Sequence, residues 1–98
     1  MIINIQALNF KANSPLTEYV QKKMDKINLL YDKVSSISVY FKLLNNNTKQ
    51  NKFSEFILHI PGEDLVVKKQ GQSFEECVDL SLDAIKIQLE KEKNKKRK

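Results

Sequence analysis

Ten basic side chains, gathered in three groups, are the residues of this chain best suited to binding another molecule. The groups are Lys22, Lys23 and Lys26; Lys86, Lys91 and Lys93; and Lys95, Lys96, Arg97 and Lys98. Lysine acts as a point charge, which favours contact with phosphates over bidentate recognition of base edges. Nucleic acid is therefore the first partner to consider.

The net positive charge of the chain is concentrated at its C-terminal end. The 98 residues contain 17 Lys and Arg against 12 Asp and Glu, a formal net charge of +5. The last eight residues, KEKNKKRK, hold six bases and one acid, so the first 90 hold 11 of each. We predict one binding domain over residues 1–90 and a basic tail over residues 91–98 that extends the last helix. A purely structural explanation stays open, because bases at a helix C-terminus complement the helix dipole.

Few residues are suited to catalysis or to metal binding. His59 is the only histidine and Cys77 is the only cysteine. The chain has just two glycines. His59 falls mid-strand with no cysteine nearby in sequence, and Cys77 falls among apolar helix positions, where a thiol is usually inert. No glycine-rich phosphate loop is present. We therefore predict no enzyme activity, no metal, no cofactor and no small-molecule substrate.

The sequence also bears on the cellular compartment. No run approaches the roughly 20 apolar residues of a membrane span, and no signal peptide opens the chain. A lone cysteine cannot form an intrachain disulfide. We expect a cytoplasmic protein with no membrane partner.

Hydrophobic periodicity predicts the elements that position the basic groups. Alternating apolar residues predict four strands, at residues 3–7, 37–43, 56–60 and 65–69. Helical spacing predicts one apolar stripe on each of two helices. The first stripe consists of Leu16, Val20, Met24, Ile27 and Tyr31, and the second of Phe74, Cys77, Val78, Ser81, Leu82, Ile85 and Leu89.

Turn and capping residues predict where these elements begin and end. Ser14 is predicted to cap the first helix, with Pro15 at its first position. Ser73 and Glu76 are predicted to form a capping box for the second helix. Two further segments predict turns: Asn45-Asn46-Asn47 after the second strand, and Pro61-Gly62 in a hairpin between the third strand and a short fourth one.

The predicted fold is α+β, with the order β-α-β-β-β-α. The first helix is long enough for a right-handed crossover between two parallel strands, which gives a four-stranded mixed sheet. Both helices should cover one face, since each has a single apolar stripe. The other face is expected to be largely solvated and to carry Ser38, Lys42, Glu55, His59 and Lys68.

Several segments, in a fixed order and spacing, carry a family resemblance. They are MIINIQALNF at the start, residues 19–27 with Tyr31-Asp32, Pro61-Gly62, Ser73-Phe74-Glu75, Asp79, Ala84-Ile85-Lys86 and Gln88-Leu89. Together they resemble the ribosome hibernation-promoting factors, also called ribosome-associated translation inhibitors. The similarity covers nearly the full chain, and its specificity comes from the order of the segments, not from any single motif.

The resemblance implies a fold akin to double-stranded-RNA-binding domains and a function on the ribosome. Family members bind the small ribosomal subunit and its ribosomal RNA near the decoding centre, and they inhibit translation in stationary phase or stress. The resemblance also implies a short form without the dimerisation domain of long members, and a monomer off the ribosome.

In the family, basic residues of both helices meet ribosomal RNA. That role is matched in this chain by Lys22, Lys23, Lys26, Lys86, Lys91 and Lys93, with the basic tail beyond them. Ile87 and Glu90 stand where relatives often carry Arg or Lys.

Two other functions stay open from the sequence. One is a general double-stranded-RNA-binding module, which would bind naked duplex as tightly as it binds ribosomes. The other is a protein-interaction module that uses the basic tail on an acidic partner.

Overall fold

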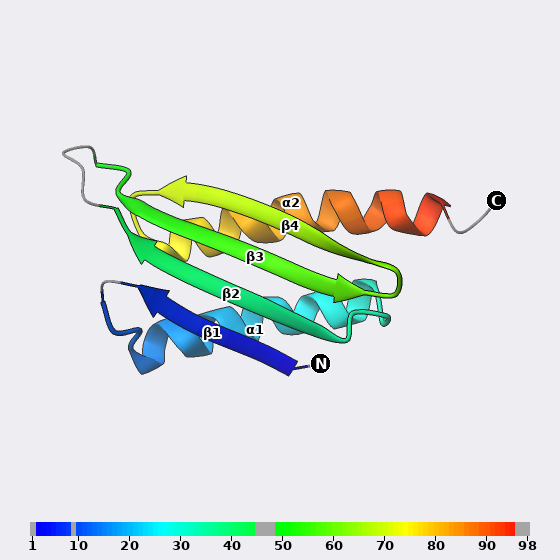
Figure 1. Cartoon of the computed structure of the whole chain (residues 1–98), viewed down its shortest axis with the longest axis horizontal. Helices are drawn as coiled ribbons and strands as arrows, with labels where there is room; N and C mark the ends of the chain where they lie inside the picture. The colour runs from blue at the N-terminus through cyan, green and yellow to red at the C-terminus, as the bar shows by residue number, and fades with distance from the viewer. Residues whose placement is uncertain (1, 9, 45–48, 96–98) are drawn as a thin grey trace.

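The described residues form four strands and two helices (Figure 1). The computed structural model describes residues 2–8, 10–44 and 49–95. In chain order the elements are β1 (Ile2–Leu8), α1 (Ser14–Leu30), β2 (Ser36–Leu43), β3 (Lys52–Ile60), β4 (Glu63–Gly71) and α2 (Phe74–Lys95). The predicted β-α-β-β-β-α order is confirmed. The turn predicted at residues 45–47 lies outside the described residues.

The strands form one mixed sheet in the order β1-β2-β3-β4. β1 and β2 are parallel, whereas β2–β3 and β3–β4 are antiparallel. Figure 1 shows both helices behind the sheet, on one face, as predicted. The α+β class with a four-stranded mixed sheet is therefore confirmed, and kinship to double-stranded-RNA-binding domains stays a prediction.

The third and fourth strands are longer than the apolar pattern predicted. Each spans nine residues, and their pairing runs from Ile60 opposite Glu63 to Lys52 opposite Gly71. The prediction of a short fourth strand was wrong because main-chain pairing continues through polar residues at strand ends. The predicted Pro61-Gly62 turn is confirmed, and Gly62 adopts a φ of 88°, which glycine tolerates without a side-chain clash.

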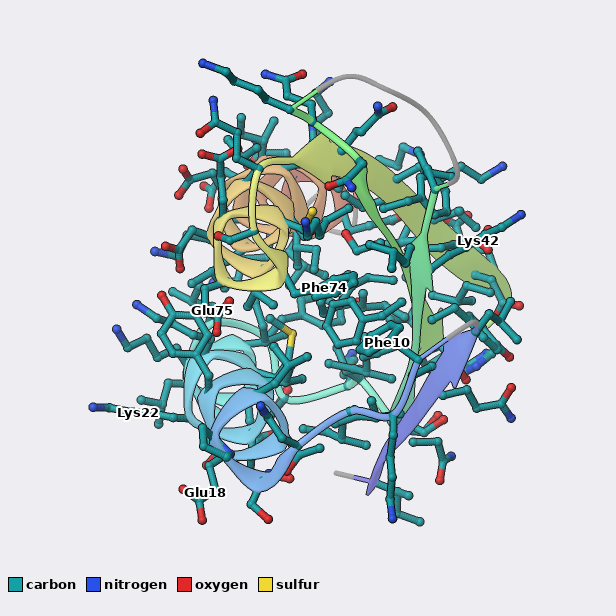
Figure 2. All side chains as sticks on the ribbon, turned by 90° about the vertical axis from the view of Figure 1, so that its left-hand side faces the viewer. Phe10, Glu18, Lys22, Lys42, Phe74 and Glu75 are labelled. Atoms are coloured by element: carbon teal, nitrogen blue, oxygen red, sulfur yellow. The ribbon has the colours of Figure 1, made fainter. Side chains whose placement is uncertain are left out.

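Four phenylalanine rings tie the sheet to the second helix. Phe41 of β2 lies edge-on to Phe56 of β3, with centroids 6.3 Å apart, and to Phe74 of α2, at 5.2 Å. Phe10, in the connection after β1, stacks on Phe74 at 4.4 Å (Figure 2). The β1–α1 connection therefore closes one end of the core.

The predicted cap of α1 was wrong by one residue, whereas the Ser73 cap of α2 is confirmed with one changed hydrogen bond. The cap of α1 is Asn13, whose Oδ1 accepts a hydrogen bond from the Leu16 N–H at 3.0 Å; Ser14 already belongs to the helix. Sequence alone did not separate them because adjacent Asn and Ser are both favoured caps. At α2, the Glu76 N–H donates to Ser73 Oγ as predicted, but the Glu76 carboxylate accepts from the Gln72 N–H instead of from that of Ser73.

The correction of the first cap gives a stability prediction. Asn13→Ala should lower the free energy of unfolding by about 1 kcal/mol, because the Leu16 N–H loses its acceptor. For a domain of this size the melting temperature should fall by about 4–8 °C. Ser14→Ala is the matched control and should lower the melting temperature much less. An equal or larger loss in the Ser14 variant, measured by thermal denaturation, would return the capping role to Ser14.

Candidate nucleic-acid interface

The seam between the two helices is held by a three-residue polar cluster. The Tyr19 hydroxyl of α1 donates a hydrogen bond to Asp79 Oδ1 of α2 at 2.6 Å. Lys23 Nζ lies 3.7 Å from the same oxygen and 5.2 Å from the centroid of the Tyr19 ring. Asp79 therefore joins both α1 side chains to α2, and the helices lie side by side (Figure 2).

This cluster divides the three lysines of α1 into two kinds. Lys23 is engaged with Asp79 and its side chain is only 25% exposed. Lys22 and Lys26 are exposed, and neither forms an ion pair with any residue in the described part of the chain. Their ammonium groups are therefore the α1 charges best placed to meet a phosphate.

On α2, the structure brings Lys86 and Lys91 together. Both line a shallow hollow of about 370 Å³ on this helix, and Ile87, Glu90 and Asn94 complete its walls. Ile87 is 60% exposed. The two positions singled out from the sequence as departures, Ile87 and Glu90, thus lie between the two lysines.

The remaining basic candidates are placed differently. Lys93 is half-buried, whereas Lys95 is exposed and lies 3.8 Å from a carboxylate oxygen of the buried Glu92. Helix α2 continues through Lys95, so the first five residues of the predicted tail are helical. Lys96, Arg97 and Lys98 lie outside the described residues.

Two acids in the N-terminal half of α2 make structural contacts. Glu76 caps the helix start, and Asp79 closes the seam to α1. Glu75 and Glu76 lie in the first turn, while Lys93 and Lys95 lie in the last. Each set complements the helix dipole, so the basic half of the helix surface is the half toward its C-terminus.

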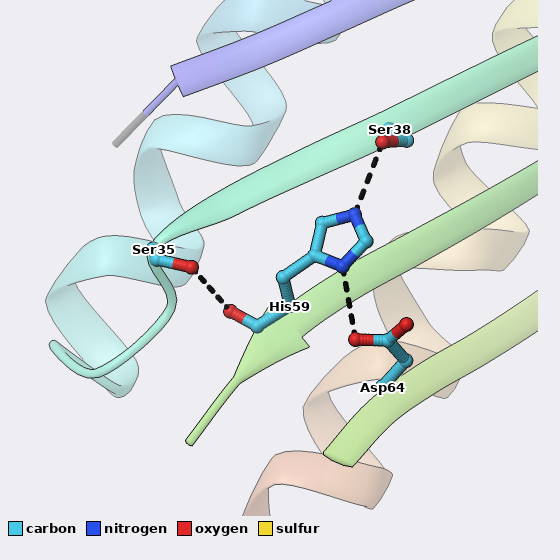
Figure 3. A network of polar contacts seen from close by, with 4 residues as sticks. All are labelled: Ser35, Ser38, His59 and Asp64. Carbon is cyan, nitrogen blue, oxygen red and sulfur yellow. Dashed lines mark hydrogen bonds and ion pairs between the residues drawn. The ribbon is translucent and has the colours of Figure 1, made fainter. Parts of the chain in front are cut away.

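A serine, a histidine and an aspartate form a hydrogen-bonded chain on the other face of the sheet (Figure 3). His59 Nε2 lies 3.2 Å from Ser38 Oγ, and His59 Nδ1 lies 2.9 Å from Asp64 Oδ1. The Ser35 hydroxyl also donates to the His59 carbonyl. Sequence reasoning missed the Asp64 contact, although the Pro61-Gly62 hairpin places residues 59 and 64 opposite each other.

Ser38, His59 and Asp64 are connected in the order found in hydrolase triads, but their surroundings differ from those of a catalytic site. β2 and β3 are both inner strands, so the backbone N–H groups around Ser38 and His59 are engaged by neighbouring strands. They cannot supply the free donors that stabilise an oxyanion. The three side chains instead link β2, β3 and β4 and favour one pairing register.

Two further features of the described residues concern metals and membranes. No cluster of three or more His, Cys, Asp or Glu side chains suited to holding a metal ion occurs among them. Neither described helix combines the length and apolar character that crossing a bilayer requires.

Comparison with known proteins identifies the family. Residues 3–97 match the family model described as sigma 54 modulation protein / S30EA ribosomal protein. The chain belongs to this family.

Curated relatives of this S30EA family match along almost the whole chain. A ribosome hibernation promoting factor of Pseudomonas putida is 27% identical over 97% of this chain and 89% of its own length. A ribosome hibernation promoting factor of Escherichia coli K12 is 27% identical over 97% of this chain and 96% of its own length.

Solved structures of similar fold support the same architecture. A ribosomal subunit interface protein from Coxiella burnetii superposes with a TM-score of 0.84, at 23% identity, over 96% of this chain and 99% of that one. The N-terminal domain of Thermus thermophilus Protein Y superposes with a TM-score of 0.78, at 17% identity, over 93% of this chain and 98% of that one.

The polar cluster at the helix seam gives a pH prediction. The hydrogen bond to Asp79 raises the pKa of Tyr19 from 10.0 to about 12, and desolvation is the second largest cause of this shift. Because the folded-state pKa is the higher one, the stabilisation is complete below pH 10 and is lost as pH rises through 12. Tyr19→Phe should remove this part of the alkaline pH dependence of the free energy of unfolding.

The measurement is a tyrosinate absorbance titration of the wild type minus that of Tyr19→Phe. The absorbance difference, which reports Tyr19, should rise with a midpoint near pH 12. In an Asp79→Ala background this midpoint should move toward pH 10. A wild-type midpoint at the ordinary value of 10.0 would contradict the Tyr19–Asp79 bond.

Proposed function

We propose that this chain is a ribosome hibernation factor, which binds the small ribosomal subunit near the decoding centre and inhibits translation in stationary phase or stress. The observation that carries the proposal is similarity along 97% of the chain to proteins named ribosome hibernation promoting factor. A cytoplasmic location and a monomeric state off the ribosome are parts of the same proposal.

The proposed mechanism is occlusion, with no catalytic step. Lys22 and Lys26 of α1 and Lys86 and Lys91 of α2 are all exposed, and none of the four takes part in an ion pair between described residues. They would meet ribosomal RNA phosphates, releasing counterions from the RNA. Because lysine reads charge and not base edges, the site would be selected by RNA shape.

The other basic candidates have supporting roles in this proposal. Lys23 would contribute less than its neighbours, because Asp79 already offsets its charge. The binding domain would span residues 1–90, and residues 91–98 would extend α2 toward more phosphates. The outer contacts would come from Lys93, Lys95, Lys96, Arg97 and Lys98.

Charge reversal on the two helices tests the proposal. Lys26→Glu/Lys86→Glu should weaken binding to small subunits at least tenfold, because two phosphate contacts become repulsive. The slope of the logarithm of the binding constant against the logarithm of salt concentration should also become less steep by about 2. The control, Lys11→Glu/Lys33→Glu, changes net charge equally on the loops before and after α1. Co-sedimentation with purified subunits at several salt concentrations measures all three proteins.

Three outcomes would count against this function. Wild-type protein that stays at the top of the gradient would remove the ribosome as partner. Equal losses in the two double variants would show that net charge, and not the helix surface, determines binding. A ribosomal RNA duplex that competes as well as whole subunits would favour the general double-stranded-RNA-binding module.

A further inference from the structure

In the described part of the chain, two aromatic side chains lie on the sheet face opposite the helices. Tyr40 of β2 and Phe53 of β3 are half-buried, and they alternate with buried inward-facing neighbours. In the β2–β3 ladder, Tyr40 pairs with Glu55 and Lys42 pairs with Phe53. The two aromatic residues are therefore diagonal neighbours on the same face, within reach of a common ligand.

Neither ring is taken up by the aromatic core. Among the described residues, the ring contacts join Phe10, Phe41, Phe56 and Phe74, and they include neither Tyr40 nor Phe53. The partly buried apolar side chains that pack against the core do not include them either.

Lysines border the two rings. Lys42 is exposed, lies opposite Phe53 and forms no ion pair within the described part of the chain. Figure 2 shows Lys42 projecting from the sheet on the side away from the helices. Lys68 lies opposite Glu55, 3.9 Å from its carboxylate, and its side chain is 62% exposed.

An amide side chain completes this surface. Gln6 of β1 pairs with Tyr40 across the parallel ladder. It is exposed and makes no hydrogen bond through its side chain to any described residue, so its amide is available to a base edge. We name Gln6, Tyr40, Lys42, Phe53 and Lys68 the open-face platform.

We propose that the open-face platform binds single-stranded RNA, with bases stacked on Tyr40 and Phe53 and a phosphate held by Lys42. Lys68 contributes less, because Glu55 already offsets its charge. Aromatic residues on a four-stranded sheet with its other face covered by helices are a general device for stacking unpaired bases. A duplex keeps its bases stacked on one another and cannot use the rings. The choice of RNA over DNA rests on the proposed function.

The platform and the helix surface are back to back across the sheet. Lys22 and Lys26 belong to α1, Lys86 and Lys91 belong to α2, and both helices cover the opposite face. One molecule can therefore hold structured RNA through its helices and an unpaired strand through its sheet at the same time. Loss of one activity need not remove the other, which makes the two proposals separable.

The test uses the full chain and a fluorescent oligouridine RNA of about ten nucleotides, a length within the usual site size for such platforms. In anisotropy titrations, Tyr40→Leu/Phe53→Leu should weaken binding at least tenfold. Tyr40→Phe/Phe53→Tyr keeps both rings and should bind as the wild type does. Lys42→Gln should lower the salt-dependence slope by about 0.7, the value for one single-strand phosphate.

Val66→Ala is the matched control. Val66 is exposed on the outer side of β4, the same sheet face as Tyr40 and Phe53. This variant should keep oligouridine binding within about twofold. Sedimentation of Tyr40→Leu/Phe53→Leu with small subunits separates this proposal from the proposed function, because ribosome binding through the helices should persist.

Unchanged oligouridine binding in the folded Tyr40→Leu/Phe53→Leu variant, with its fold checked by circular dichroism, would overturn the platform. Equal affinity for a blunt RNA duplex would show that the lysines alone bind. Equal affinity for oligothymidine DNA would overturn the choice of RNA. Absence of any oligouridine binding by the wild type, with capture of an acidic protein instead, would reassign the face to a protein partner.

Discussion

The structure depends on one constraint: the apolar stripes of both helices must be buried on the same face of one sheet. Each large apolar side chain buried there stabilises the fold by about 1.5–3 kcal/mol, so neither helix can be turned without a large cost. Two consequences follow. Most basic side chains of the helices are exposed on the side away from the sheet, and neither described helix covers the outer sheet face. The fully buried residues that enforce this arrangement include Val20, Met24, Ile27, Phe41, Phe56, Leu58, Val78, Ile85 and Leu89.

Within that arrangement, Asp79 sets how the two helices meet. A carboxylate near lysines lowers the local positive potential, which weakens a phosphate site. Here Asp79 also accepts the Tyr19 hydroxyl and lies near the Lys23 ammonium, so one charge fixes two side chains across the seam. The helix spacing that results determines how far Lys26 lies from Lys86. Under the proposed function, Asp79 weakens nearby phosphate contacts but fixes the geometry of the helix surface, which suits recognition by RNA shape.

The sequence predicted the fold well because hydrophobic periodicity reports burial directly. The strands, both helix stripes and their common face follow from alternation and helical spacing alone. Boundaries were less predictable: Asn13 and Ser14 are equivalent caps locally, and β4 continues through Lys68 and Lys69 because its partner strand does. The ion pair of Lys23 and the hollow around Lys86 needed tertiary contacts that no local pattern contains. Tyr40 was overlooked because an outward strand position was interpreted only as solvated.

The outer sheet face is not a uniform remainder of the fold. At one end, Ser38, His59 and Asp64 join three strands by hydrogen bonds; at the other end, Tyr40 and Phe53 lie beside lysines. These ends are coupled by register, because a slip of one residue would turn every side chain of a strand to the opposite face. Such a slip would bury polar groups in the core and break the histidine contacts together. The hydrogen-bonded end therefore helps to keep the two rings diagonal and outward, which gives a structural role to a network whose residues alone suggest catalysis.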